Sequence, residues 1–131
     1  MKRRIATAMS FLVFVGGMSS SPWAQTPNKT PGSPDGAALF NQQCSACHST
    51  KAGDPPRPGP NLAGVYGRKP GVAPDFTYSE GYAKADFVWD DQHLDAYLTD
   101  PQAVIPESIM PYNQGEPQVR QAIVAYLKEA H

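Results

Sequence analysis

Apolar residues recur at helical spacing in three stretches of the chain. The first begins at Ser33-Pro34-Asp35, where a cap residue precedes a proline at the first helical position, and runs to the region of Cys44. The second begins at Asp90 and is stopped by Pro101, and the third begins near Glu116 and closes the chain. The spacing is set by Ala37, Leu39 and Phe40 in the first stretch, Leu94, Tyr97 and Leu98 in the second, and Val119, Ile123, Tyr126 and Leu127 in the third. These patterns predict three helices.

Loops rich in proline and glycine connect the predicted helices, over residues 51–74 and 101–115. A weaker helical turn is expected at 79–84. The sequence has no alternating strand pattern of useful length and no internal repeat. The predicted fold class is therefore all-α, small and loop-rich. So thin an apolar core is typical of a domain in which a bound cofactor supplies buried apolar area.

The N-terminus is arranged as a secretory signal peptide, with three basic residues followed by an apolar stretch over 5–18 and then small residues. We expect cleavage after Ala24. An uncleaved membrane anchor is the alternative, but the apolar stretch falls short of the ~20 residues that span a bilayer. The predicted organisation is a signal peptide at 1–24, a disordered linker rich in Pro, Thr, Ser and Gly at 25–34, and a folded domain at 35–131.

Removal of the signal peptide makes the chain more acidic. The whole sequence carries 11 Lys plus Arg and 12 Asp plus Glu. Three of the basic residues and none of the acidic ones lie in 1–24, so eight basic residues remain against twelve acidic ones and the net charge is near −4. This balance, without a basic run, argues against nucleic acid and against an anionic membrane surface as partners.

The segment Cys44-Ser45-Ala46-Cys47-His48 carries the most specific chemistry in the sequence. Cys-x-x-Cys-His is the attachment site of a c-type haem. Two thiols one helical turn apart can each add to a vinyl group of the same porphyrin, and the histidine that follows becomes the proximal ligand of the iron. We therefore expect one haem c, attached covalently through Cys44 and Cys47, with His48 on the iron.

Two other interpretations of this cysteine pair, the only cysteines in the chain, are open. A redox-active dithiol has the same spacing, but the βαβ pattern of a thioredoxin-like fold is absent from the sequence. A structural zinc site needs four ligands, and no second Cys-x-x-Cys or His-x-x-x-His is present. Haem attachment is the interpretation that uses every residue of the motif.

The opposite face of such an iron can be closed by a thioether or a second imidazole. Met110 is the only methionine beyond the signal peptide, and it lies in an irregular loop stiffened by Pro106 and Pro111. A lone methionine often only fills a core, but its place between two helices favours a ligand. The rivals are His93, which is expected to face solvent on the second predicted helix, and the terminal His131. If Met110 does not bind, the site is open for gas-binding or peroxidase-like chemistry.

A series of markers follows the haem motif. They are Gly59-Pro60-Asn61-Leu62, Gly64, Gly67-Arg68-Lys69, Gly71, Phe76-Thr77-Tyr78-Ser79, Trp89, Tyr97-Leu98, Pro101, Ile105-Pro106 and Met110. With them the chain resembles the class I cytochromes c of the mitochondrial-like type, including their soluble bacterial members, from about Asp35 to Lys128. The resemblance implies a domain in which the N- and C-terminal helices cross and loops enclose the haem.

The resemblance also implies roles for single side chains. The carbonyl of Pro60 would accept a hydrogen bond from His48, and Tyr97 would place its hydroxyl near the sulfur of Met110. A buried haem propionate would be bound by Tyr78, Trp89 and Ser108 as donors, with Arg68 offsetting its charge. At the crossing of the first and last helices, Gly36 and Phe40 would meet Ile123 and Tyr126.

The function implied is that of an electron carrier and not of an enzyme. One electron would pass between redox partners in the periplasm. These partners would be a membrane oxidase or reductase complex, or a dehydrogenase. The alternative is a dedicated electron-accepting haem subunit of a periplasmic dehydrogenase. We expect a monomer with no stable membrane insertion.

The chain departs from the resemblance near the exposed haem edge, where mitochondrial members carry a ring of lysines. Residues 101–115 contain no lysine. Tyr112 stands where the family usually has phenylalanine, and Tyr82 replaces a smaller polar residue, which leaves the hydrogen bonding around Tyr97 open. Docking should therefore depend less on lysine steering, and replacement of the methionine ligand by lysine at alkaline pH should be hindered.

Overall fold

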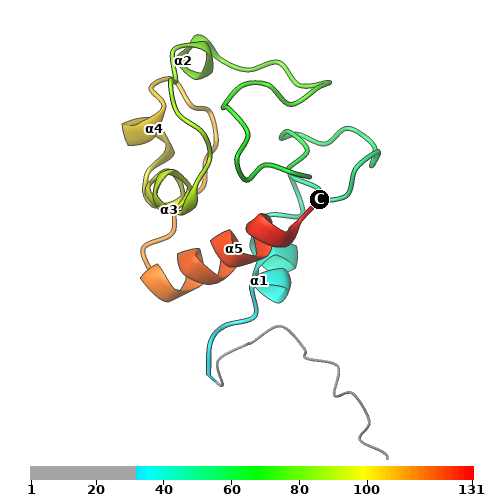
Figure 1. The fold of residues 1–131 in the computed structure, drawn as a ribbon, viewed down its shortest axis with the longest axis vertical. Coiled ribbons are helices and arrows are strands. Elements are labelled where there is room, and N and C mark those ends of the chain that lie inside the picture. Colours follow the sequence, from blue (N-terminus) through cyan, green and yellow to red (C-terminus); the bar gives the residue numbers. More distant parts are fainter. Residues whose placement is uncertain (1–31) are drawn as a thin grey trace, which may run out of the picture.

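Helices occupy both ends of the chain that the computed structural model describes, residues 32–131 (Figure 1). They are α1 (Gly36–Gln43), α2 (Glu80–Ala83), α3 (Asp91–Thr99), α4 (Pro101–Val104) and α5 (Pro117–Glu129). No strand occurs within residues 32–131, which confirms the all-α class. None of these helices is long and apolar enough to cross a membrane. The expected signal peptide, and the expected linker up to residue 31, lie outside the described residues.

The first helix is capped by Asp35 and not by Ser33. The Asp35 carboxylate accepts hydrogen bonds from the backbone N–H groups of Ala37 and Ala38 at 3.1 and 3.3 Å. A carboxylate at this position also meets the positive end of the helix dipole. Pro34 therefore lies before the helix, and the predicted start at that proline was wrong.

Asp90 caps α3, as predicted. The prediction for the next segment was wrong, because Pro101 does not lead into a loop but begins the short helix α4. Asp100 caps this turn by accepting hydrogen bonds from the N–H groups of Gln102 and Ala103 at 3.1 and 3.2 Å. A proline at the first helical position leaves no N–H group unpaired, so it can end one helix and start another.

The first and last helices cross, as the resemblance implied (Figure 1). A Cβ atom at Gly36 would overlap the carbonyl oxygen of Ala122, so only glycine permits this close approach. Next to the crossing, the ring centroids of Phe40 and Tyr126 lie 5.2 Å apart, and Ile123 is fully buried. The contact joins the two ends of the described domain directly.

The core lies between α1, α3 and α5 and the segments that follow α4. Its buried apolar side chains are Phe40, Val65, Ala73, Trp89, Leu94, Tyr97, Leu98, Ile105, Ile123, Val124 and Leu127. Figure 1 shows the loops of residues 48–78 on one side of the domain and α3 and α4 on the other. The loop side is tied to the end of α5 by a hydrogen bond from Gly64 N–H to the carbonyl of Ala130, at 2.7 Å. The loops of residues 48–78 and the helices α3 and α4 therefore lie on opposite sides of the domain above the crossed helices (Figure 1).

Candidate haem site

Cys44 and Cys47 lie on a single turn that continues α1. The Cys44 N–H donates to the carbonyl of Phe40 at 2.8 Å, and the N–H groups of Cys47 and His48 both donate to the carbonyl of Cys44, at 3.0 and 2.9 Å. Cys44 is half-buried and Cys47 is exposed. Burial, with a smaller contribution from Cys47, raises the pKa of the Cys44 thiol to about 11, so this thiol is protonated at neutral pH. The turn presents two thiols and one imidazole within five residues.

The ring of His48 is held by the backbone of a neighbouring loop. Its Nδ1 lies 2.8 Å from the carbonyl oxygen of Pro60, so Nδ1–H donates and Nε2 keeps a free lone pair. Burial lowers the pKa of His48, and the Pro60 carbonyl opposes this shift. Gly59 packs against the ring so closely that a Cβ there would overlap Cε1 and Nδ1. A neutral imidazole with a fixed tautomer is the form that can bind a metal.

Met110 is half-buried against the core, in the irregular segment between α4 and α5. Two residues before it, the buried hydroxyl of Ser108 lies 2.8 Å from that of Tyr97 and 3.2 Å from that of Tyr82. The two tyrosine hydroxyls are themselves 2.5 Å apart. This hydroxyl cluster of Tyr82, Tyr97 and Ser108 answers the question that the sequence left open about Tyr97. It also engages Ser108, whose single hydroxyl hydrogen can bond to only one acceptor at a time.

A second set of contacts holds the same segment just after Met110. The Tyr112 hydroxyl donates to Oε1 of Gln43 at 2.7 Å, and Nε2 of Gln114 donates to the same oxygen at 3.1 Å. The Gln114 N–H donates to the carbonyl of Leu98 at 2.8 Å. The buried guanidinium of Arg120 then donates to the carbonyl of Gln114 at 2.9 Å. Side chains from α1 and α5 therefore fix where this segment runs.

The residues expected to bind an acidic group gather in the loops before α3. Arg68 is half-buried and donates to the carbonyls of Asn61 and Ala63, both at 3.0 Å. Burial raises the pKa of Tyr78, and the charge of Arg68 opposes this shift. Trp89 is buried, and its ring lies edge-on to that of Tyr97 at 4.9 Å between centroids.

Ser79, which in the sequence is only one marker of the resemblance, has an unexpected environment in the structure. Its hydroxyl is the one buried side-chain polar atom without a hydrogen-bond partner among residues 32–131. It caps α2 by position, but its side chain accepts no capping hydrogen bond. A buried hydroxyl without a partner is costly, so this atom suits a ligand that supplies an acceptor. Its place next to Tyr78 was the signal available in the sequence.

His93 does not simply face solvent, as was expected, but is half-buried on α3. Its ring stacks on Phe87 with 4.2 Å between centroids, and its Nδ1 lies 2.8 Å from Oδ1 of Asp90. The histidine is therefore engaged by its own helix cap. Among residues 32–131, no group of three or more His, Cys, Asp or Glu side chains is placed to hold a metal ion.

The donors described here fit a c-type haem. Two thiols lie one turn apart, a neutral imidazole has a free Nε2, and the buried Ser79 hydroxyl, which has no hydrogen-bond acceptor, follows Tyr78 in the chain.

A sequence model of the cytochrome c family matches residues 33–131. The chain belongs to the cytochrome c family. Its members carry one covalently bound haem c, and in this cytochrome c the cysteine pair is Cys44 and Cys47. It is an electron-transfer protein and not an enzyme.

Similar proteins are found in both eukaryotes and bacteria. Cytochrome c of Theileria parva is 42% identical over 96 residues, which are 72% of this chain and 83% of the relative. Cytochrome c2 of Rhodopila globiformis is 40% identical over 100 residues, covering 75% of this chain and 93% of the relative. Cytochrome c2 iso-2 of Magnetospirillum fulvum is 45% identical over 86 residues, covering 65% and 88%. The identification of the family thus rests on nearly the whole described domain.

Proposed function

We propose that this cytochrome c is a monohaem carrier that passes one electron between redox partners in the periplasm, with His48 and Met110 as the residues that would bind the haem iron. The observation that carries the proposal is the hydrogen bond from His48 Nδ1–H to the Pro60 carbonyl, because it leaves the Nε2 lone pair free to bind a metal. The haem supplies a one-electron iron couple when bound.

The protein's own residues would fix both sides of that iron. Cys44 and Cys47 would hold the porphyrin through two thioethers, and His48 would offer the iron the Nε2 lone pair that its hydrogen bond to Pro60 leaves free. Met110 offers a soft thioether, which favours the reduced iron more than a second imidazole does. Since no bond to a substrate is made or broken, the chain needs no catalytic base or nucleophile.

The haem propionates need hydrogen-bond donors and a positive charge when they are buried. The proposed donors are Tyr78, Trp89, Ser79 and Ser108, with Arg68 as the charge. Ser79 is the donor best placed to bind a propionate, because its buried hydroxyl has no other partner in the described domain. Ser108 contributes less, because Tyr82 and Tyr97 already engage it.

Replacement of Met110 tests the ligand assignment. The ferric wild-type protein should show the far-red charge-transfer band of a thioether bound to iron, and Met110→Leu should lose this band and bind added imidazole at once. His93→Ala is the matched control, and it should keep the band. A band that survives in Met110→Leu, or that disappears in His93→Ala, would overturn the assignment.

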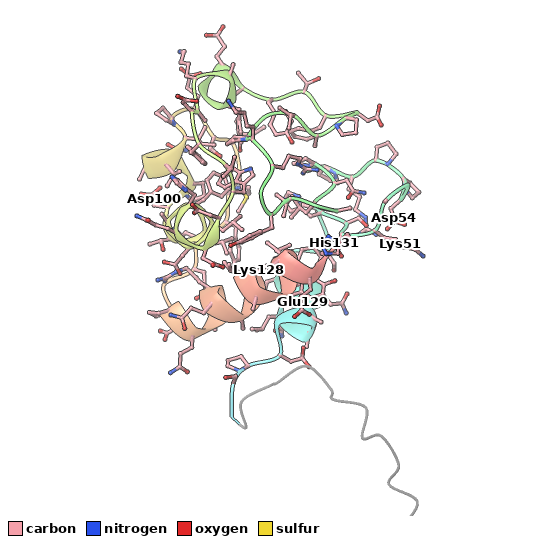
Figure 2. The ribbon with its side chains drawn as sticks, in the orientation of Figure 1. Lys51, Asp54, Asp100, Lys128, Glu129 and His131 are labelled. Carbon is pink, nitrogen blue, oxygen red and sulfur yellow. The ribbon has the colours of Figure 1, made fainter. Side chains whose placement is uncertain are left out.

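The proposed docking face is the Met110 segment itself, residues 101–115, which carries a single charge. Glu107 is the only charged residue in 101–115, and Ile109 next to Met110 is 79% exposed. Lys51 projects from a loop on the far side of the domain from Asp100, which caps α4 (Figure 2). Partners would therefore be recognised by apolar and neutral contacts more than by charge steering.

Electron-transfer kinetics across salt concentrations test this docking face. With a mitochondrial-type oxidase as acceptor, the rate should change little between low and high ionic strength. The variant Gln102→Lys/Ala103→Lys should make the rate fall as salt is added, because it introduces positive charge on the face. A steep salt dependence in the wild-type protein would contradict the proposal.

Export to the periplasm is the remaining part of the proposal, and it rests on the N-terminal sequence. Residues 1–24 would be removed as a signal peptide, and 25–34 would link the cleavage site to the folded domain at 35–131. N-terminal sequencing of the haem-containing protein from a periplasmic fraction should begin at Gln25. A haem protein that retains Met1 and sediments with membranes would show an anchor instead.

A further inference from the structure

We propose that Gln43 and Tyr112 form a latch that keeps the Met110 segment closed, so that both are positioning residues for the methionine ligand. The proposal rests on Met110 being that ligand. It concerns what holds the ligand in place and how often it leaves the iron.

The backbone around Met110 has little support of its own. The Ser108 N–H donates to the carbonyl of Ile105, and the Gln114 N–H donates to that of Leu98, but within the described domain residues 109–113 form no backbone hydrogen bond. The side chain of Ile109 is 79% exposed, so packing does not hold this stretch from outside. The position of Met110 therefore depends on side-chain contacts on either side of it.

The latch lies on the C-terminal side of Met110. Oε1 of Gln43 accepts the Tyr112 hydroxyl at 2.7 Å and Nε2 of Gln114 at 3.1 Å, so one amide oxygen binds two donors from the loop. Gln43 is the last residue of α1 and directly precedes Cys44. The loop that carries one iron ligand is thus tied to the helix that carries the haem attachment site.

This contact depends on the hydroxyl of Tyr112. A phenylalanine at position 112 would fill the same space but would have no donor for Gln43. The same stretch, 101–115, contains no lysine that could bind the iron once Met110 leaves. The hydroxyl and the absence of lysine act in the same direction, because the first makes opening less frequent and the second removes a local replacement ligand.

The opening rate of the loop in the ferric holoprotein tests the latch. Imidazole is the probe, because it can bind the iron only after Met110 has left, so its binding rate at saturating imidazole equals the opening rate. In Tyr112→Phe this rate should rise about tenfold, as expected for one lost neutral hydrogen bond. The matched control is Tyr126→Phe, which removes a hydroxyl that lies 2.9 Å from Oγ1 of Thr50, away from the loop, and should leave the rate unchanged.

A double mutant separates the latch from general weakening of the fold. Gln43→Met removes the shared acceptor and should open the loop at least as fast as Tyr112→Phe does. The double variant Gln43→Met/Tyr112→Phe should open within twofold of Gln43→Met, because both changes delete the Tyr112–Gln43 hydrogen bond and only the long contact from Gln114 Nε2 to the Tyr112 hydroxyl, at 3.4 Å, is left to lose. Amide exchange of residues 109–113 should accelerate in these variants and not in Tyr126→Phe, which gives a readout independent of iron ligation.

The outcomes distinguish the latch from the proposed function. If the wild-type protein lacks the thioether–iron band and its imidazole rate never saturates, Met110 is not the ligand and both proposals fail. If the band and the saturation are present but Tyr112→Phe opens within twofold of wild type, only the latch is wrong. Equal acceleration in Tyr112→Phe and Tyr126→Phe would also overturn it.

Discussion

The segments that carry His48 and Met110 are held in different ways. The His48 side is built from backbone, since its ring binds the Pro60 carbonyl and rests on Gly59, whose own N–H donates to the carbonyl of Cys47 at 2.8 Å. The Met110 side has no backbone hydrogen bond from 109 to 113 in the described domain and is held by side chains of distant segments.

This difference indicates that the proposed ligand His48 is held permanently, whereas the proposed ligand Met110 can be exchanged for another. Contacts between backbone segments that are close in the sequence form as part of the fold itself. A bulkier residue at such a contact overlaps its close-packed neighbours. Contacts through hydroxyl and amide groups each contribute about 1 kcal/mol, so they can break one at a time. We expect the His48 side to fail by loss of stability and the Met110 side to fail by opening.

The largest effect is expected on the His48 side, in Gly59→Ala. The new Cβ would overlap the imidazole and would lie 3.0 Å from the carbonyl oxygen of Cys47, and neither group can move without disturbing the haem motif. The free energy of unfolding of the holoprotein should fall by about 3 kcal/mol in denaturant titration. Gly115→Ala is the control, because no atom lies within 4 Å of its Cβ position, and it should stay near wild type. A stable Gly59→Ala protein would remove the contrast between the two sides.

Arg120→Lys should have the next largest effect and should weaken the Met110 side. The guanidinium donates to Asp95 at 2.8 and 3.3 Å and to the carbonyls of Gln114 and Gly115 at 2.9 and 3.0 Å, a set that one ammonium group cannot reproduce. We expect a loss of about 2 kcal/mol in unfolding free energy. In contrast, Lys84→Gln, which removes an exposed pair with Glu80, should change stability by less than about 0.5 kcal/mol. Similar losses in both variants would mean that burial of Arg120 is irrelevant.

Ser108→Ala should loosen the segment from its N-terminal side. It deletes the hydroxyl that Tyr97 and Tyr82 contact, but these tyrosines keep each other as partners. Unfolding free energy should therefore fall by only about 1 kcal/mol, while imidazole should bind several-fold faster. Thr99→Ala removes an exposed hydroxyl bonded within α3 and should alter neither quantity. An unchanged imidazole rate in Ser108→Ala would show that the hydroxyl cluster does not restrain the loop.

The smallest effect is expected away from both sides, where Lys128 projects from α5 (Figure 2) and donates to Asp91 at 2.9 Å. The Lys128 contact, followed by the Tyr66 hydroxyl, holds the pKa of Asp91 below its ordinary value. A carboxylate with a lowered pKa stabilises the fold above its unfolded-state pKa, near 4, and this contribution is lost as pH falls through the folded-state pKa. The small stability difference between wild type and Asp91→Asn should thus be present at pH 7 and vanish in acid. A difference that persists in acid would point to packing and not to charge.

The sequence predicted the His48 side better than the Met110 side, for a physical reason. The motif, Gly59 and Pro60 lie close together in the chain, so their relation can be inferred from spacing. The partners of the Met110 segment come from α1, α2, α3 and α5, and a pair such as Gln43 and Tyr112 has no local signature. For Ser79 the sequence shows only that it follows Tyr78, and the lack of a partner for its buried hydroxyl is seen only in the folded structure.

The helix boundaries show a related limit. Asp35 and Ser33 are both acceptable caps, and only the folded geometry distinguishes the aspartate that reaches two N–H groups. Likewise, Pro101 was expected only to end a helix, yet with Asp100 before it the same residue starts one. The repeat of apolar residues correctly predicted α3 and α5, because both bury one face over several turns.

The crossing of α1 and α5 at Gly36 joins helices that lie far apart in the sequence. Such a contact forms only once the chain between the two helices has been brought into place. In an unfolded chain both thiols are accessible, whereas in the folded domain Cys44 is half-buried. Attachment of the haem to Cys44 should therefore be easiest before the two ends of the domain meet.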